Sequence, residues 1–296
     1  MAAQFATPPG RKLVEEIAEI FRNKPIFRRW PPHVLFVCGG PVTGAVSMRS
    51  EFITWAKTAL PDFTVVLAEN AFKEALFGPP AFINLAKFEK LVAEISDCVL
   101  IFPESDGSLA EIGYFAAVEE IRTKVLVVND RRFEAVDSFI TLGPVSAINV
   151  DSYLQPALHV DSPGTGIDFN SLDQRLKRTR ERLSRRRKLD HKPYGKLDYG
   201  SKFCILLELI RLLRAVTVAG LNRTVKAAFG RPTDIELILS ILVGSGLVLR
   251  RDEYFVATNP TVSLVDIDDA DVNTLIARAL FYHQKHDPRA VDMLAR

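Results

Sequence analysis

The sequence predicts an α/β fold in which a doubly wound parallel sheet of five strands is followed by a smaller helical domain. Between residues 33 and 150, short unbroken apolar runs alternate with segments of helical periodicity. Strands that are buried on both faces of a parallel sheet have this pattern. Beyond residue 200, three apolar helical segments precede two apolar runs around a charged turn, which indicates a separate domain.

The strands are expected at five apolar runs in the first half of the chain. Four runs are clear and the last is weaker: 34–38, 63–68, 98–102, 125–128 and 145–150. Helices are expected where apolar residues recur at helical spacing, at 11–24, 46–60, 80–95 and 107–121. For such a sheet we expect a flavodoxin-like strand order.

The second half contains a linker, a basic helix and a compact domain. Residues 151–172 are rich in Pro, Gly, Ser and Asp, which predicts irregular structure, and a basic helix is expected over 173–189. Further helices are expected at 203–216, 218–229, 233–243 and 270–284, with a hairpin within 244–258. Three helices followed by a hairpin is the order of a winged-helix domain. We therefore predict an α/β domain at 1–172, a basic helix with linker at 173–200 and a winged-helix-like domain at 201–296.

Composition and charge narrow the class of protein. The net charge is only +2, so there is no overall attraction to nucleic acid. Three cysteines without paired spacing and five histidines without metal-ligand spacing favour a reducing compartment and predict no metal site. The first residues do not resemble a signal peptide, and no window approaches the roughly 18 apolar residues of a membrane span. We therefore expect a cytoplasmic protein with no membrane partner.

Glu111 is the first candidate for catalysis. The apolar strand at 98–102 leads into a small polar turn, and the helix that carries this carboxylate starts directly after the turn. Ligands of open α/β sheets bind beyond the carboxyl ends of the strands, where such turns lie. A charged side chain on an apolar segment is usually paired or functional. Two alternatives stay open: Ser108 only caps the helix, and Glu111 is a solvated acid favoured by the helix dipole.

Residues 104–114, Glu-Ser-Asp-Gly-Ser-Leu-Ala-Glu-Ile-Gly-Tyr, resemble the turn and helix of the nucleoside 2-deoxyribosyltransferases. In that family the glutamate is the nucleophile toward the anomeric carbon of a nucleoside, which implies this role for Glu111. The resemblance places the sugar and phosphate loop at 38–40 and an acid that contacts the base at Glu89. Ser105 stands where many members have Asp, so base recognition is expected to differ.

A closer resemblance covers most of the chain and is to retron effector proteins. It is carried by Cys-Gly-Gly at 38–40, Arg49, the segment 102–111, and Ser-Phe-Ile with Gly-Pro-Val within 138–145. These effectors are deoxyribosyltransferase-like toxins of phage defence with a C-terminal winged helix. The resemblance implies an N-glycosidase held inactive by a retron reverse transcriptase and its RNA–DNA hybrid (msDNA), and it leaves room for a higher-order assembly. It also implies NAD as a substrate rather than a cofactor, with no cofactor required.

The chemistry assigns roles to the acids of this region. Cleavage of an N-glycosidic bond passes through an oxocarbenium-like state, so one carboxylate must face the anomeric carbon while a second acid helps the base to leave. We expect Glu111 in the first role and Glu104 or Glu89 in the second. Amides at the helix start are expected to hold a hydroxyl or a phosphate. Arg49 is expected to bind a phosphate or, alternatively, to pair with Glu51 or Glu69. The expected substrate-binding set is Cys38, Gly39, Gly40, Arg49, Glu69, Ser105, Asp106, Gly107, Ser108 and Tyr114.

The predicted basic helix is a candidate surface for a polyanion. Like charges at helical spacing destabilise a helix unless a partner compensates them, although a solvated charged helix is the common alternative. The expected nucleic-acid-binding residues are Arg175, Lys177, Arg178, Arg180, Arg182, Arg185, Arg186, Arg187 and Lys188. The third helix of the C-terminal domain is acidic, which favours docking to a protein or a structured nucleic acid over reading of a DNA groove.

Two other functions remain possible from the sequence. One is a nucleotide-sensing regulator, in which the α/β domain binds a nucleotide without cleaving it. The other is a phosphoribohydrolase of the lysine-decarboxylase-like type, which also uses a glycine-rich turn followed by a glutamate.

Overall fold

The structure, a computed structural model, describes residues 4–41, 44, 46–73, 84–183, 187–268 and 271–295. The chain divides into two compact units. The α/β unit comprises 31–68 and 83–185, and the second unit comprises 1–30, 69–82 and 186–296. Among the described residues, no helix combines the length and apolar character needed to cross a membrane.

A parallel sheet of five strands forms the centre of the α/β unit. Its order is β3-β2-β4-β5-β6, and each neighbouring pair is parallel. The strands are β2 (His33–Cys38), β3 (Phe63–Val66), β4 (Cys98–Ile101), β5 (Val125–Asp130) and β6 (Leu158–Val160). In chain order this is the 2-1-3-4-5 arrangement of flavodoxin-like sheets, so the predicted sheet and its order are confirmed.

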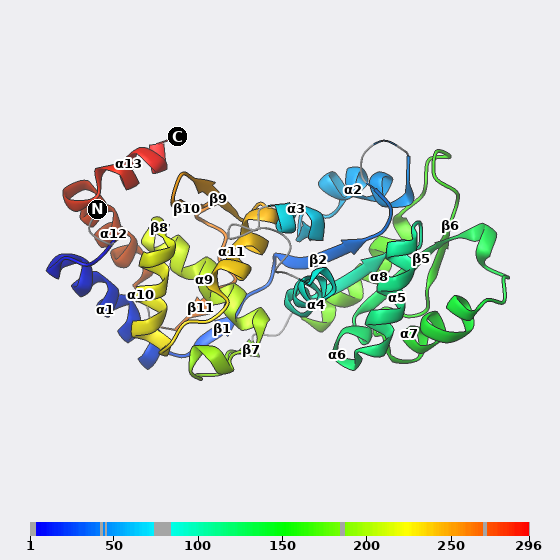
Figure 1. Cartoon of the computed structure of the whole chain (residues 1–296), viewed down its shortest axis with the longest axis horizontal. Coiled ribbons are helices and arrows are strands. Elements are labelled where there is room, and N and C mark those ends of the chain that lie inside the picture. The colour runs from blue at the N-terminus through cyan, green and yellow to red at the C-terminus, as the bar shows by residue number, and fades with distance from the viewer. Residues whose placement is uncertain are drawn as a thin grey trace. The chain divides into compact units, whose positions relative to one another are not determined.

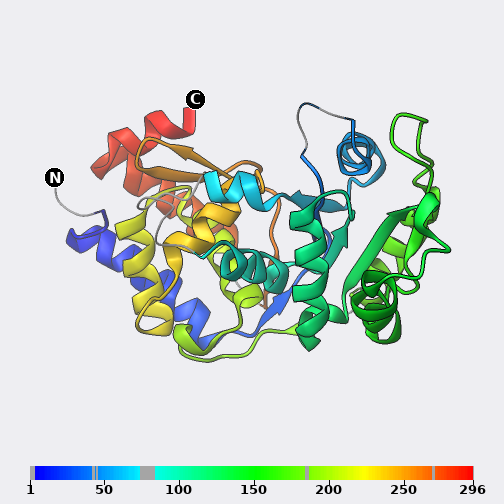
Figure 2. The same cartoon turned by 45° about the vertical axis from the view of Figure 1, so that its right-hand side comes forward.

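Helices lie on both sides of this sheet (Figure 1; Figure 2). They are α2 (Met48–Ala59), α4 (Leu85–Ile95), α5 (Asp106–Ala117), α6 (Glu119–Arg122), α7 (Ser146–Asp151) and α8 (Asn170–Arg182). Helices α2 and α8 share one apolar cluster with Leu35 and Val37 of β2. The intervening residue Phe36 points to the opposite face, where its ring lies 6.2 Å from that of Phe115 on α5. The alternation of side chains along β2 therefore separates the two layers of helices.

The predicted fifth strand at 145–150 is wrong, because this run is helical. A π-helical turn (Thr141–Val145) leads into α7, and the fifth strand is instead β6. Val145 and Ile148 are buried while Val150 is 73% exposed. This is the spacing of a helix with one buried face rather than that of a strand buried on both faces.

The second unit contains two antiparallel sheets. One has the order β11-β1-β7 and joins distant parts of the chain: β11 (Val265–Ile267), β1 (Ile26–Arg28) and β7 (Arg187–Lys188). The other has the order β8-β10-β9, with strands β8 (Ala215–Thr217), β10 (Tyr254–Ala257) and β9 (Val248–Arg251). The predicted hairpin is thus present as β9 and β10, which pair in antiparallel register.

Longer helices complete the described part of the second unit. They are α1 (Pro8–Asn23), α9 (Tyr199–Leu213), α10 (Val218–Phe229), α11 (Ile235–Gly244), α12 (Val272–His286) and α13 (Pro288–Ala295), with the short α3 (Ala68–Lys73) and a 3-10 turn at Tyr194–Lys196. Helix α1 belongs to this unit because its apolar face packs on α10, where the Phe21 and Phe229 rings are 5.6 Å apart. The predicted α/β domain at 1–172 included this helix, whereas the structure groups it with the second unit.

The predicted basic helix at 173–189 is shorter than expected. Helix α8 starts at Asn170 and ends at Arg182, and Arg187 and Lys188 form β7. Their backbone pairs with β1, which requires extended geometry and so excludes a helix there. Arg185 and Arg186 lie outside the described residues.

Candidate active site

Two glycines after β2 allow close packing at the carboxyl edge of the sheet. A Cβ atom on Gly39 would lie 3.0 Å from the Arg49 Cδ and from the Phe102 Cβ. A Cβ atom on Gly40 would lie 3.2 Å from the Glu104 Cβ. Contacts this short are tighter than most that real Cβ atoms make, so a side chain at either position would have to displace its neighbour, and the positive φ of Gly39, 155°, further favours glycine there.

Arg49 is buried, at 5% exposure, and its guanidinium holds this loop. Its Nη1 donates to the Gly40 carbonyl at 3.1 Å and its Nη2 donates to the Val37 carbonyl at 2.9 Å. Donors that serve backbone carbonyls are not presented to a ligand, so the geometry favours a positioning role over the predicted phosphate contact. The alternative partner Glu51 accepts instead from the backbone amides of Gly164 and Ile167.

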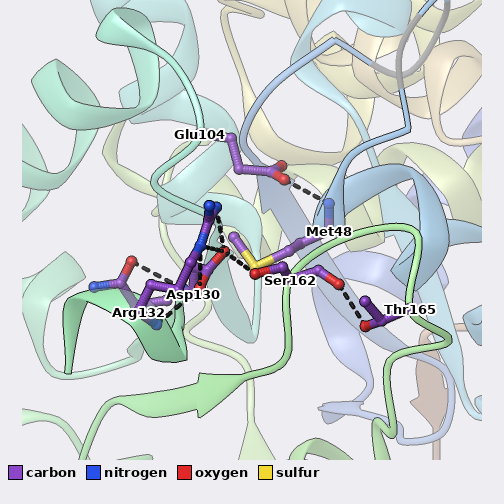
Figure 3. A network of polar contacts seen from close by, with 7 residues as sticks. Met48, Glu104, Asp130, Arg132, Ser162 and Thr165 are labelled. Carbon is purple, nitrogen blue, oxygen red and sulfur yellow. Dashed lines mark hydrogen bonds and ion pairs between the residues drawn. The ribbon is translucent and has the colours of Figure 1, made fainter.

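Glu104 caps helix α2. Its carboxylate accepts from the backbone amide of Met48 (Figure 3) and from that of Arg49, the latter at 3.1 Å. The first amides of a helix have no partner within the helix, and a carboxylate there also interacts favourably with the helix dipole. Both carboxylate oxygens of Glu104 are therefore occupied, which makes it a weaker candidate than Glu89 for the acid that assists the leaving base.

The polar turn before Glu111 is a helix cap. Ser105, not Ser108, is the N-cap of α5, and the two serines form a reciprocal capping box. Ser108 is 1% exposed, and its hydroxyl accepts from the backbone amides of Glu104 and Ser105, each at 3.0 Å. Asp106 and Gly107 occupy the exposed first positions of the helix. The bonds of Ser108 make it a structural residue rather than a ligand contact.

Glu111 is partly buried between Glu89 of α4 and Cys38 at the end of β2. Its Oε2 is buried without a hydrogen-bond partner among the described residues. Burial, and then the nearby charge of Glu89, raise the pKa of Glu111 from 4.5 to about 7, against the lowering effect of a hydrogen bond from the Cys38 thiol and of the Arg49 charge. Burial, and then the nearby charge of Glu111, raise the pKa of the Cys38 thiol well above its usual value. A carboxyl group that ionises near neutrality beside a second carboxylate can serve in acid–base or nucleophilic chemistry.

The remaining predicted contacts are distributed over both units. Tyr114 lies one turn beyond Glu111 on α5 and is 37% exposed. Glu69 lies in the first turn of α3 and belongs to the second unit. Both roles stay predictions. Among the described residues, no group of three or more His, Cys, Asp or Glu side chains could hold a metal ion.

Most of the basic residues of α8 contact this chain itself. Arg175 and Arg178 both donate to the Gln155 carbonyl, the latter at 2.7 Å. Arg180 forms ion pairs with Asp62 and Asp173, and Arg182 lies over the Tyr153 ring at 4.7 Å. Lys177, Arg187 and Lys188 are exposed. Among the described residues, no side-chain hydrogen bond or ion pair is seen for Lys177 and Lys188, and Arg187 interacts electrostatically with Asp190. The available basic surface is therefore smaller than the sequence predicts.

One further polar cluster was missed by the sequence predictions. Asp130, the last residue of β5, accepts from the side chains of Arg132 and Ser162 (Figure 3). Val127 is paired with Ile101 in the sheet, and Asp130 and Glu104 both follow that pair toward the carboxyl edge. An acid at the carboxyl end of an apolar strand, followed by two arginines, is the signal that could have identified this cluster.

Comparisons with known proteins agree on one family. A family model described as STM3845 retron effector protein matches residues 45–250. An Escherichia coli protein provisionally named as the ribosyltransferase/DNA-binding protein of retron Ec86 is 33% identical over 111 residues, which is 38% of this chain. Its counterpart from retron Ec73, also from Escherichia coli, is 31% identical over 121 residues, or 40% of this chain. The matched regions span 36% and 38% of those two proteins.

Proposed function

Because the chain belongs to the STM3845 retron effector family, we propose that it is an N-glycosidase that releases the base of a nucleotide, with NAD as the preferred substrate. The observation that carries this proposal is the Oε2 of Glu111, which is buried beside a second carboxylate and has no hydrogen-bond partner in the part of the chain that the structure describes. An unpartnered buried carboxylate oxygen is costly, and such groups are found where a ligand completes the site. The ribosyltransferase part of the relatives' names is consistent with this chemistry.

Glu111 acts in the proposed reaction by facing the anomeric carbon. As the bond between that carbon and the base nitrogen breaks, positive charge develops on the sugar, and the ionised Glu111 stabilises it. Water then supplies the oxygen that replaces the base, and one proton is released. With NAD the nicotinamide leaves as a neutral molecule because its ring nitrogen is cationic before cleavage. With a purine substrate the protonated form of Glu89 would supply the proton that the base needs.

The second unit has the proposed role of tethering the enzyme to the retron. Its elements follow the order α9, β8, α10, α11, β9, β10, with a three-stranded sheet, which is the order of a winged-helix domain. Asp234 before α11 forms an ion pair with the buried Lys202 at 3.2 Å, so this acid has a structural role. We expect the unit and the exposed basic residues to dock on the reverse transcriptase and its RNA–DNA hybrid in the cytoplasm, holding the enzyme inactive.

Chromatography of released bases tests the proposal. The purified chain is incubated with NAD, nucleoside monophosphates and nucleosides, and each mixture is examined for free base. Release of nicotinamide from NAD is the expected result. Release from monophosphates alone would favour a phosphoribohydrolase, and binding of nucleotides without release would favour a regulator. Copurification with a reverse transcriptase and hybrid nucleic acid tests the tethering role, and a chain recovered without either contradicts it.

A further inference from the structure

An exposed guanidinium is fixed by a buried carboxylate at the carboxyl edge of the sheet. The Arg132 side chain is 69% exposed, whereas that of Asp130 is 4% exposed. The Arg132 Nε lies 3.1 Å and 3.0 Å from the two carboxylate oxygens, and its Nη2 lies 2.8 Å from Oδ2. The Arg132 backbone amide also donates to Oδ1 at 2.8 Å. This fork holds the guanidinium in one orientation.

Both carboxylate oxygens of Asp130 already accept hydrogen bonds. Ser162 donates its hydroxyl to Oδ2 at 2.9 Å. The Arg132 hydrogen bonds lower the pKa of Asp130 to about 2, so the carboxylate stays charged near neutrality. The guanidinium keeps both Nη1 hydrogens and one Nη2 hydrogen for another acceptor, and no other acceptor within the described part of the chain takes them. The arrangement is therefore a positioned, outward-facing donor set.

This donor set lies at the carboxyl edge of the sheet, which is the edge where ligands of such sheets bind. Asp130 ends β5, and β5 lies next to β4, whose following segment carries Glu104 and leads into the helix of Glu111 (Figure 3). The carboxylates of Glu89 and Glu111 lie near each other in the candidate site, and their negative charge repels a phosphate. The buried guanidinium of Arg49 serves the backbone instead. A phosphorylated substrate consequently needs a cation from another element of this edge.

We infer that Arg132 binds the phosphate of the nucleotide substrate and so makes the enzyme select nucleotides over nucleosides. This inference rests on the proposed function, because the phosphate belongs to the molecule whose base is released. A guanidinium with parallel free hydrogens matches two phosphate oxygens, which an ammonium group cannot do.

Nicotinamide mononucleotide and nicotinamide riboside form a suitable pair of probes, since they differ only by the phosphate. Their dissociation constants are measured by calorimetry on the full chain with Glu111→Gln, so that neither probe is consumed. Arg132→Gln is expected to weaken binding of the mononucleotide by about 10- to 100-fold and to leave the riboside unchanged. The matched control is Arg131→Gln, which removes a neighbouring exposed arginine paired with Asp161 at 3.1 Å and is expected to change neither.

Arg132→Lys guards against a folding defect, because lysine keeps a charge beside Asp130 and loses only the fork. It is expected to bind the mononucleotide several-fold more weakly, with an unchanged melting temperature. The inference is overturned if Arg132→Lys weakens the binding of both probes equally. It is also overturned if the substitution leaves the dissociation constant of the mononucleotide unchanged. Displacement of the mononucleotide by an equal concentration of inorganic phosphate also overturns it, because the site would then be one for free phosphate. If wild type releases no base but Arg132 still governs mononucleotide binding, the proposed function fails and the phosphate site stands.

Discussion

Replacing Glu111 by glutamine should stabilise the protein, although this residue is the proposed centre of the chemistry. Its pKa rises from 4.5 in water to about 7 in the folded chain, so folding disfavours the ionised carboxylate. A shift of this size corresponds to roughly 3 kcal/mol against the folded state once pH exceeds the folded pKa. We therefore expect a net gain of about 1–3 kcal/mol in the free energy of unfolding of Glu111→Gln at pH 8.

The sign of this effect depends on pH. A raised carboxyl pKa contributes stability below the unfolded value near 4.5, and this contribution is lost as pH rises through about 7. Wild type and Glu111→Gln should therefore have nearly equal stability at pH 4.5 and diverge between pH 5 and pH 8. Glu119→Gln on α6, an exposed acid of the same unit, should change stability by less than about 0.5 kcal/mol at every pH.

Urea unfolding followed by tryptophan fluorescence can report on the α/β unit alone. The chain has two tryptophans, and Trp55 packs against Phe52 and Phe169 within that unit. In a Trp30→Phe background the second unit has no tryptophan, so the fluorescence change reports the unfolding of the α/β unit alone. A Glu111→Gln chain that is less stable than wild type at pH 8, or a gain that is equal at pH 4.5 and pH 8, would refute the reasoning.

Three other outcomes follow from the same contacts. Base release from NAD should rise with pH as Glu111 ionises, with a midpoint near pH 7. Glu89→Gln should move that midpoint to lower pH because it removes a neighbouring negative charge. An unmoved midpoint would show that Glu89 does not influence the ionisation of Glu111. Glu104→Gln should lower the free energy of unfolding by about 1 kcal/mol at pH 7 through loss of its α2 cap, and an unchanged urea midpoint would contradict that role. The depressed pKa of Asp130, about 2, supplies stability that is complete above pH 4 and lost as pH falls toward 2, so acid titration should show this loss in wild type and not in Asp130→Asn.

Strands β2, β3, β4 and β5 of the α/β unit were predictable because burial leaves an apolar run in the sequence. Helix α10 was also predicted with its observed bounds, since Gly230 ends it clearly. Strand β6 gave no such signal, because only Val160 of its three residues is fully buried. The turn at Gly143 and Pro144 starts a helix instead, and a run as short as 145–150 does not distinguish the two by periodicity.

The parts that the sequence did not predict depend on distant contacts. Lys188 lies in a strand because β1, about 160 positions earlier in the chain, offers it a partner. Glu104 was predicted to assist the leaving base and Arg49 to bind a phosphate. Only the fold reveals that backbone groups occupy both side chains. Glu111 was predicted from its local setting, an acid in an apolar helix after a strand, and from the family motif around it, and its catalytic role stays a prediction. The contacts of Glu89 and Cys38 with it had to come from the structure.

Release of nicotinamide from NAD by wild type and by Glu111→Gln is the most direct measurement of the central claim. Both chains are assayed at pH 8, where Glu111 is ionised, after their folded state is verified by melting temperature. Glu111→Gln removes the negative charge and should reduce the rate of nicotinamide release by at least about 100-fold. The variant should be at least as stable as wild type. A folded Glu111→Gln protein with full activity would show that the reaction takes place elsewhere in the molecule.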